Sequence, residues 1–518
     1  MSQLTTLLYT VGFAVVGLFG LRFLALALLA PLAARRRPLP GALVAPVPVV
    51  TVQLPLYNEQ AVAVRAIDAL CRLRWPAGRL EIQILDDSTD GTTGLARDRV
   101  QFWRQRGVDI TLLRRADRAG FKAGALAAGL AQARGQALAL FDADFLPPVD
   151  FLERCLPYLT EGVAAVQARW GHLNAGDNWL TRAQALALDG HFLVEQPCQS
   201  RLGLFLNFNG TAGVWRREAI EAAGGWQGDT LTEDFDLSYR AQLAGWRIVV
   251  LPELVAPGEL PADLAAYRRQ QRRWAMGTAQ VLRKLGGALL RAPIGLPRRL
   301  LAFLSLAGYV SHVILLVLVL AAPLALRWPP RFPAWMALAS LGPLGPPALY
   351  VAALQGLPGR RWRRLLDYPS LMLVTAGMAL VGAGAVVAGL SGRSGTFERT
   401  PKSGSGGAKS GEDGGPADVD GALQAAPEPN AGRAAWPEVG LALYAGATAV
   451  AAARVGMGWL AVFCGIFGVG FALVALGDLG QRRSPGRWVR RVWRLTTRAA
   501  PPDAPAHASA APPPAGRP

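Results

Sequence analysis

The sequence predicts an α/β protein in which a domain with a doubly wound, mainly parallel sheet is inserted between transmembrane α-helices. Short apolar runs alternate with helical patterns in the first half of segment 38–298, which is typical of parallel strands joined by crossover helices. Apolar residues make up 52% of the 518 residues and cluster in long runs near both ends. Since a helix needs about 20 mostly apolar residues to cross the hydrocarbon layer, several of these runs are candidate spans.

The chain is strongly basic, with a formal net charge of +18, and nearly all of its cations are arginines. We interpret part of this basicity as a composition bias. The remainder lies beside apolar runs, where basic residues mark the cytoplasmic side. The arginines do not gather in a recognisable reading module, so no nucleic-acid partner is expected. The four cysteines have no disulfide or metal spacing, and the four histidines argue against a histidine-based metal site.

The first apolar run, Leu4–Ala34, predicts an N-terminal signal-anchor helix within residues 1–37. No basic residues precede the run, whereas Arg35, Arg36 and Arg37 follow it. This order of charges favours an uncleaved anchor with its N-terminus outside and the following domain in the cytosol.

Strands and intervening helices are expected in the first half of the cytosolic segment. Ligands of such sheets bind beyond the carboxyl ends of the strands, so polar motifs at those ends are candidate site residues. The expected strands are Val49–Leu54, Leu80–Leu85, Val108–Leu113 and Ala137–Phe141, and the helices include Glu59–Leu73 and Ala123–Arg134.

A second membrane region is expected after the domain, in residues 299–402 and 437–480, with a disordered linker at 403–436. Residues 481–518 are expected to be a basic juxtamembrane segment and a disordered tail. The apolar runs are Leu300–Leu326, Pro333–Leu354, Pro369–Gly389, Val439–Ala453 and Met457–Leu476.

The number of crossings follows from the basic clusters Arg360–Arg364 and Arg482–Arg494. Both look cytoplasmic, so an even number of crossings should separate them, yet three apolar runs lie between. We expect Pro369–Gly389 to be the run that does not cross, as an interfacial or re-entrant segment. The prediction is therefore five spans, one before the domain and four after it.

The most specific polar motif is Asp142 and Asp144, two residues apart at the end of an apolar strand. Magnesium in proteins usually combines one or two carboxylates with substrate phosphates. The pair therefore predicts a Mg²⁺ or Mn²⁺ site that bridges a diphosphate. A solvated turn is the alternative for an isolated Asp-x-Asp.

A second acidic pair, Asp86 and Asp87, also follows a strand. The pair could cap a helix or form an Asx turn, or one carboxylate could bind a nucleobase or ribose. Pro55, Tyr57 and Glu59 follow the first strand and are further candidates for donor binding. That segment lacks Gly-x-Gly-x-x-Gly, which disfavours a dehydrogenase-type dinucleotide site.

Lys122 opens a predicted helix and is one of only four lysines. The helix macrodipole repels a cation at this end, so the position favours a bound anion such as a diphosphate. Farther on, Thr232, Glu233 and Asp234 could cap a helix or supply a general base. Gln270, Arg273 and Trp274 lie on a basic amphipathic stretch, as an interfacial anchor or as a platform for a sugar ring and its leaving diphosphate.

The order of these motifs resembles that of the family-2 glycosyltransferases of the cellulose-synthase type, over roughly Val49–Leu285. The strings GFKAGAL, FDADF, VQARW, FNGTAGVWR and YRRQQRRW are similar to the cellulose-synthase-like A and C groups, the glucomannan and xyloglucan-backbone synthases. The resemblance implies a GT-A domain, which is Rossmann-like, and an inverting enzyme that polymerises a β-linked, typically β-1,4, glycan.

The resemblance also implies roles for individual residues. Asp86 or Asp87 would contact the base, Lys122 the diphosphate, and Asp142 and Asp144 the donor and metal. Asp234 would be the base. Acceptor and diphosphate would be shaped by Thr232, Glu233, Gln270, Arg273, Trp274 and Asn209, and Phe397, Thr400 and Lys402 would belong to a gating loop that differs from the bacterial pattern at Arg399.

The expected partners are a nucleotide-sugar, either UDP-glucose or GDP-mannose with UDP-glucose slightly favoured, a growing glycan and membrane lipid. The expected location is a plasma (inner) membrane, with a multi-pass chain. The sequence does not identify accessory subunits. Two other functions stay open: transfer of a single sugar to a lipid or oligosaccharide, and a non-enzymatic membrane component.

Overall fold

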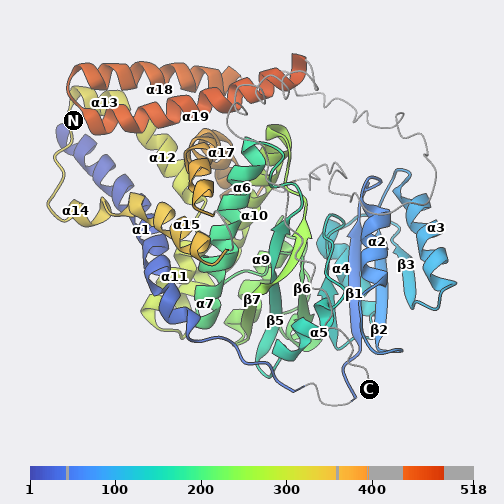
Figure 1. The fold of residues 1–518 in the computed structure, drawn as a ribbon. Coiled ribbons are helices and arrows are strands. Elements are labelled where there is room, and N and C mark those ends of the chain that lie inside the picture. The colour runs from blue at the N-terminus through green and yellow to red at the C-terminus, as the bar shows by residue number, and fades with distance from the viewer. Residues whose placement is uncertain (43–45, 358–360, 394, 396–435, 484–518) are drawn as a thin grey trace, which may run out of the picture.

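A computed structural model of the chain describes residues 1–42, 46–357, 361–393, 395 and 436–483. An α/β domain lies beside a group of apolar helices, and α6, α7 and α10 lie between the two parts (Figure 1).

The domain is built on one seven-stranded sheet with the order β3-β2-β1-β4-β6-β5-β7. Strand β6 is antiparallel to both of its neighbours, and the other pairings are parallel. The mainly parallel sheet is therefore confirmed. The strands are β1 Val50–Leu56, β2 Leu80–Asp86, β3 Ile110–Arg114, β4 Ala137–Leu140, β5 Val163–His172, β6 Gly213–Arg216 and β7 Arg247–Gly258.

The four expected strands are β1 to β4, with shifted ends. Strand β3 begins at Ile110, not at Val108, because the Val108 N–H donates to the Trp103 carbonyl at the end of the preceding helix. Val52 and Leu54 of β1 are fully buried. Helices cover both faces of a parallel sheet, which explains why these strands read as continuous apolar runs.

The helices of the domain follow the predicted alternation. The expected helix Glu59–Leu73 is shorter, because Asn58 has a left-handed φ of 56° and a turn precedes Ala63. The helices are α2 Ala63–Cys71, α3 Thr92–Arg104, α4 Phe121–Gln132, α5 Phe151–Cys155, α6 Trp179–Gly190, α7 Gln196–Arg201, α8 Arg217–Ala222, α9 Glu233–Leu243 and α10 Leu264–Arg291, with short helices η1 Leu156–Tyr158 and η2 His191–Glu195.

The apolar helices include three in the described residues that are long and apolar enough to cross a membrane: Ser2–Ala34, Met336–Gln355 and Gly458–Gly477. Two bent pairs, Leu296–Leu306 with Val310–Leu320 and Trp362–Gly377 with Ala379–Leu390, would raise the number to five. The individual elements are α1 Ser2–Ala34, α11 Leu296–Leu306, α12 Val310–Leu320, α13 Ala322–Arg327, α14 Met336–Ala339, η3 Gly342–Leu344, α15 Gly345–Gln355, η4 Arg361–Asp367, α16 Tyr368–Gly377, α17 Ala379–Leu390, α18 Trp436–Arg454 and α19 Gly458–Arg483.

These helices differ in detail from the expected spans. The run Leu300–Leu326 is not one straight helix, because α11 and α12 meet at 67°. The run Pro369–Gly389 is bent by 48° between α16 and α17, a geometry of either a broken span or a re-entrant segment. The expected span Val439–Ala453 is helical as α18, but it is not among the helices that meet the length and hydropathy requirement.

Helix α1 packs against η3 and α15 through glycines. A Cβ atom at Gly20 would lie 2.2 Å from the Gly342 carbonyl oxygen, and one at Gly345 would lie 1.9 Å from the Gly20 carbonyl oxygen. Only hydrogen atoms fit between these backbones, so small residues set the position of α1, as is common between membrane helices.

We predict that Gly20→Val lowers the thermal stability of the full chain in detergent, because the side chain would collide with backbone that cannot move aside. Overpacking of this kind typically costs about 1–3 kcal/mol. The matched control is Gly384→Ala on α17, where a Cβ atom would meet nothing within 4 Å. Equal melting temperatures for the two variants would contradict the packing argument.

Candidate functional site

A cavity of about 600 Å³ opens beyond the carboxyl ends of β1 and β4. It extends past α9 and α10 to α1, α11 and α12. It brings together almost all the residues that the sequence singled out. These are Pro55, Tyr57, Glu59, Asp87, Lys122, Asp142, Asp144, Asn209, Thr232, Glu233, Asp234, Gln270, Arg273 and Trp274.

The structure separates the two candidates of the acidic pair. Asp86 does not line the cavity: its carboxylate accepts hydrogen bonds from the Ser88 N–H at 3.0 Å and the Thr93 hydroxyl at 2.7 Å. Its geometry is that of the turn and cap interpretation. Asp87 does line the cavity, and Arg115 binds both of its oxygens, at 3.0 and 2.5 Å. The geometry therefore favours Asp87 over the predicted alternative Asp86 as a ligand group.

An arginine that the sequence reading missed completes this side of the cavity. The Arg118 guanidinium lies 3.3 Å from the centroid of the Tyr57 ring, in cation–π geometry, and both residues line the cavity. Asp87, Tyr57 and Arg118 thus offer an acceptor, a ring face and a cation at the outer end of the site. The only sequence signal for Arg118 was its place just after the third strand.

Lys122 lies in the first turn of α4, where Gly120 and Phe121 have left-handed φ values of 68° and 49°. The Lys122 ammonium donates to Asp142 Oδ1 at 2.6 Å and to the Gly210 carbonyl at 3.0 Å, and Glu233 lies at 3.7 Å. Burial disfavours its charged form, but Asp142 and Glu233 outweigh that cost and hold the pKa of Lys122 above its usual range. The lysine therefore stays a cation inside the cavity.

Asp142 and Asp144 follow β4 and both line the cavity. The Asp142 N–H donates to the Thr211 hydroxyl at 2.8 Å, and its carboxylate is about one-third exposed to the cavity. Both carboxylates line the cavity, and such a pair suits Mg²⁺ or Mn²⁺ that shares its coordination with a diphosphate. No group of three or more His, Cys, Asp or Glu side chains in the described residues could hold a metal by itself.

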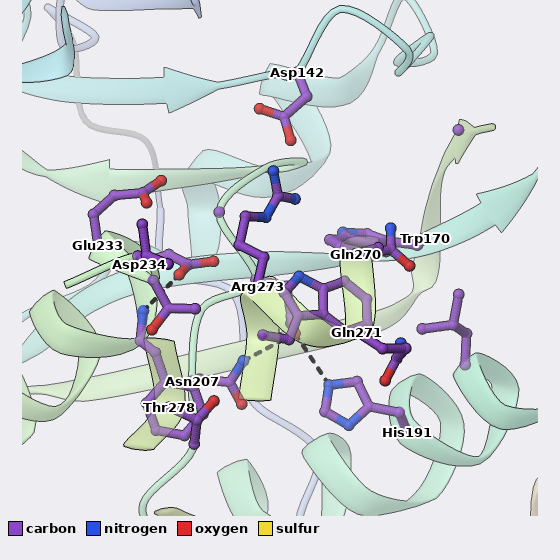
Figure 2. Close-up of a pocket in the computed structure, with 18 of the residues that line it drawn as sticks. Asp142, Trp170, His191, Asn207, Glu233, Asp234, Gln270, Gln271, Arg273 and Thr278 are labelled. Carbon is purple, nitrogen blue, oxygen red and sulfur yellow. Dashed lines mark hydrogen bonds between the residues drawn. The ribbon is translucent and has the colours of Figure 1, made fainter. Parts of the chain in front are cut away.

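Asp234 lies in the first turn of α9, next to Glu233 (Figure 2). Its carboxylate accepts the Phe235 N–H at 2.8 Å. Burial and then the neighbouring Glu233 charge raise the pKa of Asp234 to about 7, although Lys122 opposes them. A carboxylate with a pKa near the working pH is suited to accept a proton.

Helix α10 lines one side of the cavity. Arg273 and Trp274 follow Gln270 by three and four residues, so both lie on the same side of the helix as Gln270 and line the cavity with it. Figure 2 shows Arg273 between Asp142 and the Glu233–Asp234 pair. A Cβ atom at Gly277 would lie 2.6 Å from the Thr232 side chain, so this glycine allows α10 to pack closely under the start of α9.

The inner end of the cavity contains polar groups that sequence reasoning missed. Asn209 bonds to the side chains of Gln196, Asn207 and His191 at 3.0, 3.0 and 3.1 Å. His191 begins the π-helical turn η2, a rare geometry frequent at functional sites. Trp170 also lines the cavity. The expected gating-loop residues Phe397, Thr400 and Lys402 lie outside the described residues.

Comparison with known proteins finds similarity to glycosyltransferases over the α/β domain. Residues 47–277 match the family described as "Glycosyltransferase like family 2". The chain is 45% identical over 251 residues to probable glucomannan 4-beta-mannosyltransferase 6 of Oryza sativa subsp. japonica, which covers 47% of this chain and 44% of the relative. It is 41% identical over 277 residues to glucomannan 4-beta-mannosyltransferase 7 of Arabidopsis thaliana, and that match covers 52% of this chain and 50% of the relative.

The chain spans about half the length of the curated relatives it matches. Among solved structures, a mannosyltransferase from Pyrobaculum calidifontis in complex with GDP-Man and Mn²⁺ is similar with a TM-score of 0.44 and 21% identity. That match covers 72% of this chain and 99% of the other.

We predict that Gly210→Ala lowers the turnover that the site supports by about tenfold or more, since that factor needs only about 1.4 kcal/mol. Gly210 has a φ of 79°, and a Cβ atom there would lie 2.7 Å from Asp234 Oδ2. Gly225→Ala is the control, because its φ of 74° imposes similar strain but nothing lies within 4 Å. Equal turnover in the two variants, at equal folded fraction, would count against this placement of Asp234.

Proposed function

From the premise that residues 47–277 are a family-2 glycosyltransferase domain of the cellulose-synthase-like type, we propose that the chain is an inverting β-glycan synthase. It transfers a hexosyl group from a nucleotide-sugar to a hydroxyl, typically O4, of a growing glycan. The product is a polymer with β-1,4 linkages, extended processively. The catalytic domain works in the cytosol, and the apolar helices hold it at a plasma (inner) membrane.

The observation that carries this proposal is the Lys122 cluster. One cavity contains a cation bonded to Asp142 at 2.6 Å, a second carboxylate from Glu233 at 3.7 Å, and Asp234 with a raised pKa. These groups combine anion binding with proton acceptance. Transfer from a nucleoside diphosphate sugar needs both functions.

The reaction is a single in-line displacement. Asp234 accepts the proton of the acceptor hydroxyl while that oxygen forms a bond to the anomeric carbon, and the bond from that carbon to the diphosphate oxygen breaks. One displacement converts an α-linked donor into a β-linked product. The electron pair of the broken bond goes to the nucleoside diphosphate, whose added charge Lys122 and Arg273 stabilise.

Asp142 and Asp144 would hold Mg²⁺ or Mn²⁺ together with the diphosphate. The metal, when bound, supplies further positive charge to the leaving group. Asp87, Tyr57 and Arg118 would bind the nucleoside, with Pro55 and Glu59 beside them, and Gln270 and Trp274 would support the acceptor.

GDP-mannose is the donor we propose. The similar rice and Arabidopsis proteins carry the name mannosyltransferase, which favours mannose over the glucose that the sequence alone slightly favoured. Transfer of one sugar to a lipid or oligosaccharide is the second candidate function, because it needs the same cluster.

We predict that membranes containing the chain, with Mg²⁺ or Mn²⁺, incorporate label from GDP-mannose into a β-linked polymer, and that Asp234→Asn lowers this rate by about 10²- to 10⁴-fold. The asparagine cannot accept the proton. Asp229→Asn is the control, since Asp229 is exposed and pairs with Lys284 outside the cavity. Polymer from UDP-glucose alone would exclude the mannosyl donor, a product with one added sugar would favour the second function, and undiminished activity of Asp234→Asn would exclude the base.

A pH dependence follows from the raised pKa of Asp234, about 7. The base acts only when ionised, so kcat/KM should be full above this pKa and fall as pH decreases through it. The pH profile of initial rates measures this limb. Glu233→Gln removes a neighbouring negative charge, so the limb should move to lower pH. A limb near pH 4, unmoved by Glu233→Gln, would contradict the assignment.

A further inference from the structure

Helix α1 has a single charged residue, Arg22, and this arginine reaches the catalytic cavity. Arg22 lies 12 residues before the end of α1 at Ala34, which is about 18 Å along the helix. It is only 7% exposed, and its guanidinium binds Glu195 Oε1 at 2.5 Å. A charged residue within a membrane helix usually has a functional role together with its partner.

Glu195 connects this arginine to His191. Its second oxygen lies 2.9 Å from His191 Nδ1. Burial opposes ionisation of Glu195, but Arg22 and His191 outweigh it and lower the pKa of Glu195 to about 2. The group facing His191 is therefore a carboxylate, which only accepts hydrogen bonds.

The other side of His191 faces Asn209, whose amide orientation is fixed by its neighbours. Gln167 Nε2 donates to the backbone carbonyls of Ala168, Thr211 and Ala212, so Gln167 Oε1 points to the Asn209 backbone N–H. Gln196 Nε2 donates to the Asn207 carbonyl, which leaves Gln196 Oε1 to accept from Asn209 Nδ2 at 3.0 Å. Asn209 Oδ1 must then be the atom that faces His191.

His191 consequently faces an acceptor at each ring nitrogen, Glu195 Oε2 at 2.9 Å and Asn209 Oδ1 at 3.1 Å. Asn209 Oδ1 also accepts from Asn207 Nδ2 at 3.0 Å. Because Asn207 Nδ2 makes that bond, the orientation of the Asn207 amide is fixed, and Asn207 Oδ1 is the atom that remains to accept a hydrogen bond. Within the described part of the chain, no hydrogen bond reaches Asn207 Oδ1, and Asn207 lines the cavity.

The residue that follows Asn207 is hydrogen-bonded to α9, the helix that begins with Glu233 and Asp234. The Phe208 N–H donates to the Ser238 hydroxyl at 2.8 Å, and that hydroxyl donates to the Asp234 carbonyl at 2.5 Å. Figure 2 shows Asn207 and His191 on the side of Asp234 and Arg273 that is away from Asp142. Asn207 therefore lies on the side of the cavity away from Asp142, where the proposed reaction needs the acceptor.

We infer that Asn207 Oδ1 accepts a hydrogen bond from a hydroxyl of the acceptor sugar, and that His191, Glu195 and Arg22 are positioning residues that fix this oxygen through Asn209. The inference rests on the proposed function, because it names a specificity contact for the same glycan acceptor. Asn209, with both amide atoms bonded, supports the contact without making it.

The test measures acceptor binding, which does not depend on turnover. The full chain in lipid nanodiscs is titrated with β-1,4-linked mannohexaose and with analogues that lack the 3- or the 6-hydroxyl of the terminal sugar. Asn207→Leu should raise Kd by about tenfold, the effect of a lost hydrogen bond in a buried site, and Glu195→Gln should act in the same direction. One deoxy analogue should bind the unsubstituted chain more weakly and bind Asn207→Leu no worse than mannohexaose does.

Two comparisons separate this contact from a structural role. Arg22→Lys keeps the charge and should bind mannohexaose better than Arg22→Met. Asp68→Asn breaks a different ion pair, to Arg99 at 2.5 Å, and should leave Kd unchanged. A deoxy penalty that persists in Asn207→Leu, or unchanged Kd in Asn207→Leu, would overturn the inference. If the unsubstituted chain bound mannohexaose but did not turn over the donor, that result would count against the proposed function alone, since Kd is measured separately.

Discussion

The Lys122 ammonium lies among carboxylates that come from separate elements: Asp142 from the end of β4, and Glu233 and Asp234 from the start of α9. Each of these charges is costly to bury alone, and removal of one partner from such a group is typically destabilising by about 3–5 kcal/mol. The cluster therefore holds α4, β4 and α9 in fixed relation. Burial and the neighbouring Glu233 charge raise the pKa of Asp234 within this cluster, and Lys122 offsets them only in part.

The sheet and most of the site were predictable because the signals are local. Strands β1 to β4 are short apolar runs, and the polar residues at their ends need only the topology of a parallel sheet to converge. Lys122 was recognisable because a cation at a helix N-terminus is unfavourable without an anion. The sequence predicted a bound diphosphate there, and the structure places Asp142 beside the ammonium at 2.6 Å.

The omissions came from side-chain contacts and backbone geometry that no local sequence pattern predicts. Asp86 and Asp87 are adjacent, and only their partners Thr93 and Arg115 distinguish a turn carboxylate from a cavity carboxylate. His191 gave no pattern, because its contacts are with Glu195 within a π-helical turn and with Asn209, which follows after a loop. The bend between α11 and α12 was also missed. The apolar run continues on both sides of Gly308 and Tyr309, so it was predicted as one span.

The ion pair between Arg22 and Glu195 has a consequence for biogenesis. The two residues are 173 positions apart, so a ribosome finishes α1 long before it makes the partner of its arginine. During that interval the helix carries an uncompensated charge, and its position in the bilayer is a compromise between hydration of the arginine and burial of its neighbours. The contact between Arg22 and Glu195 can therefore form only after the α/β domain has been made and packs against α1.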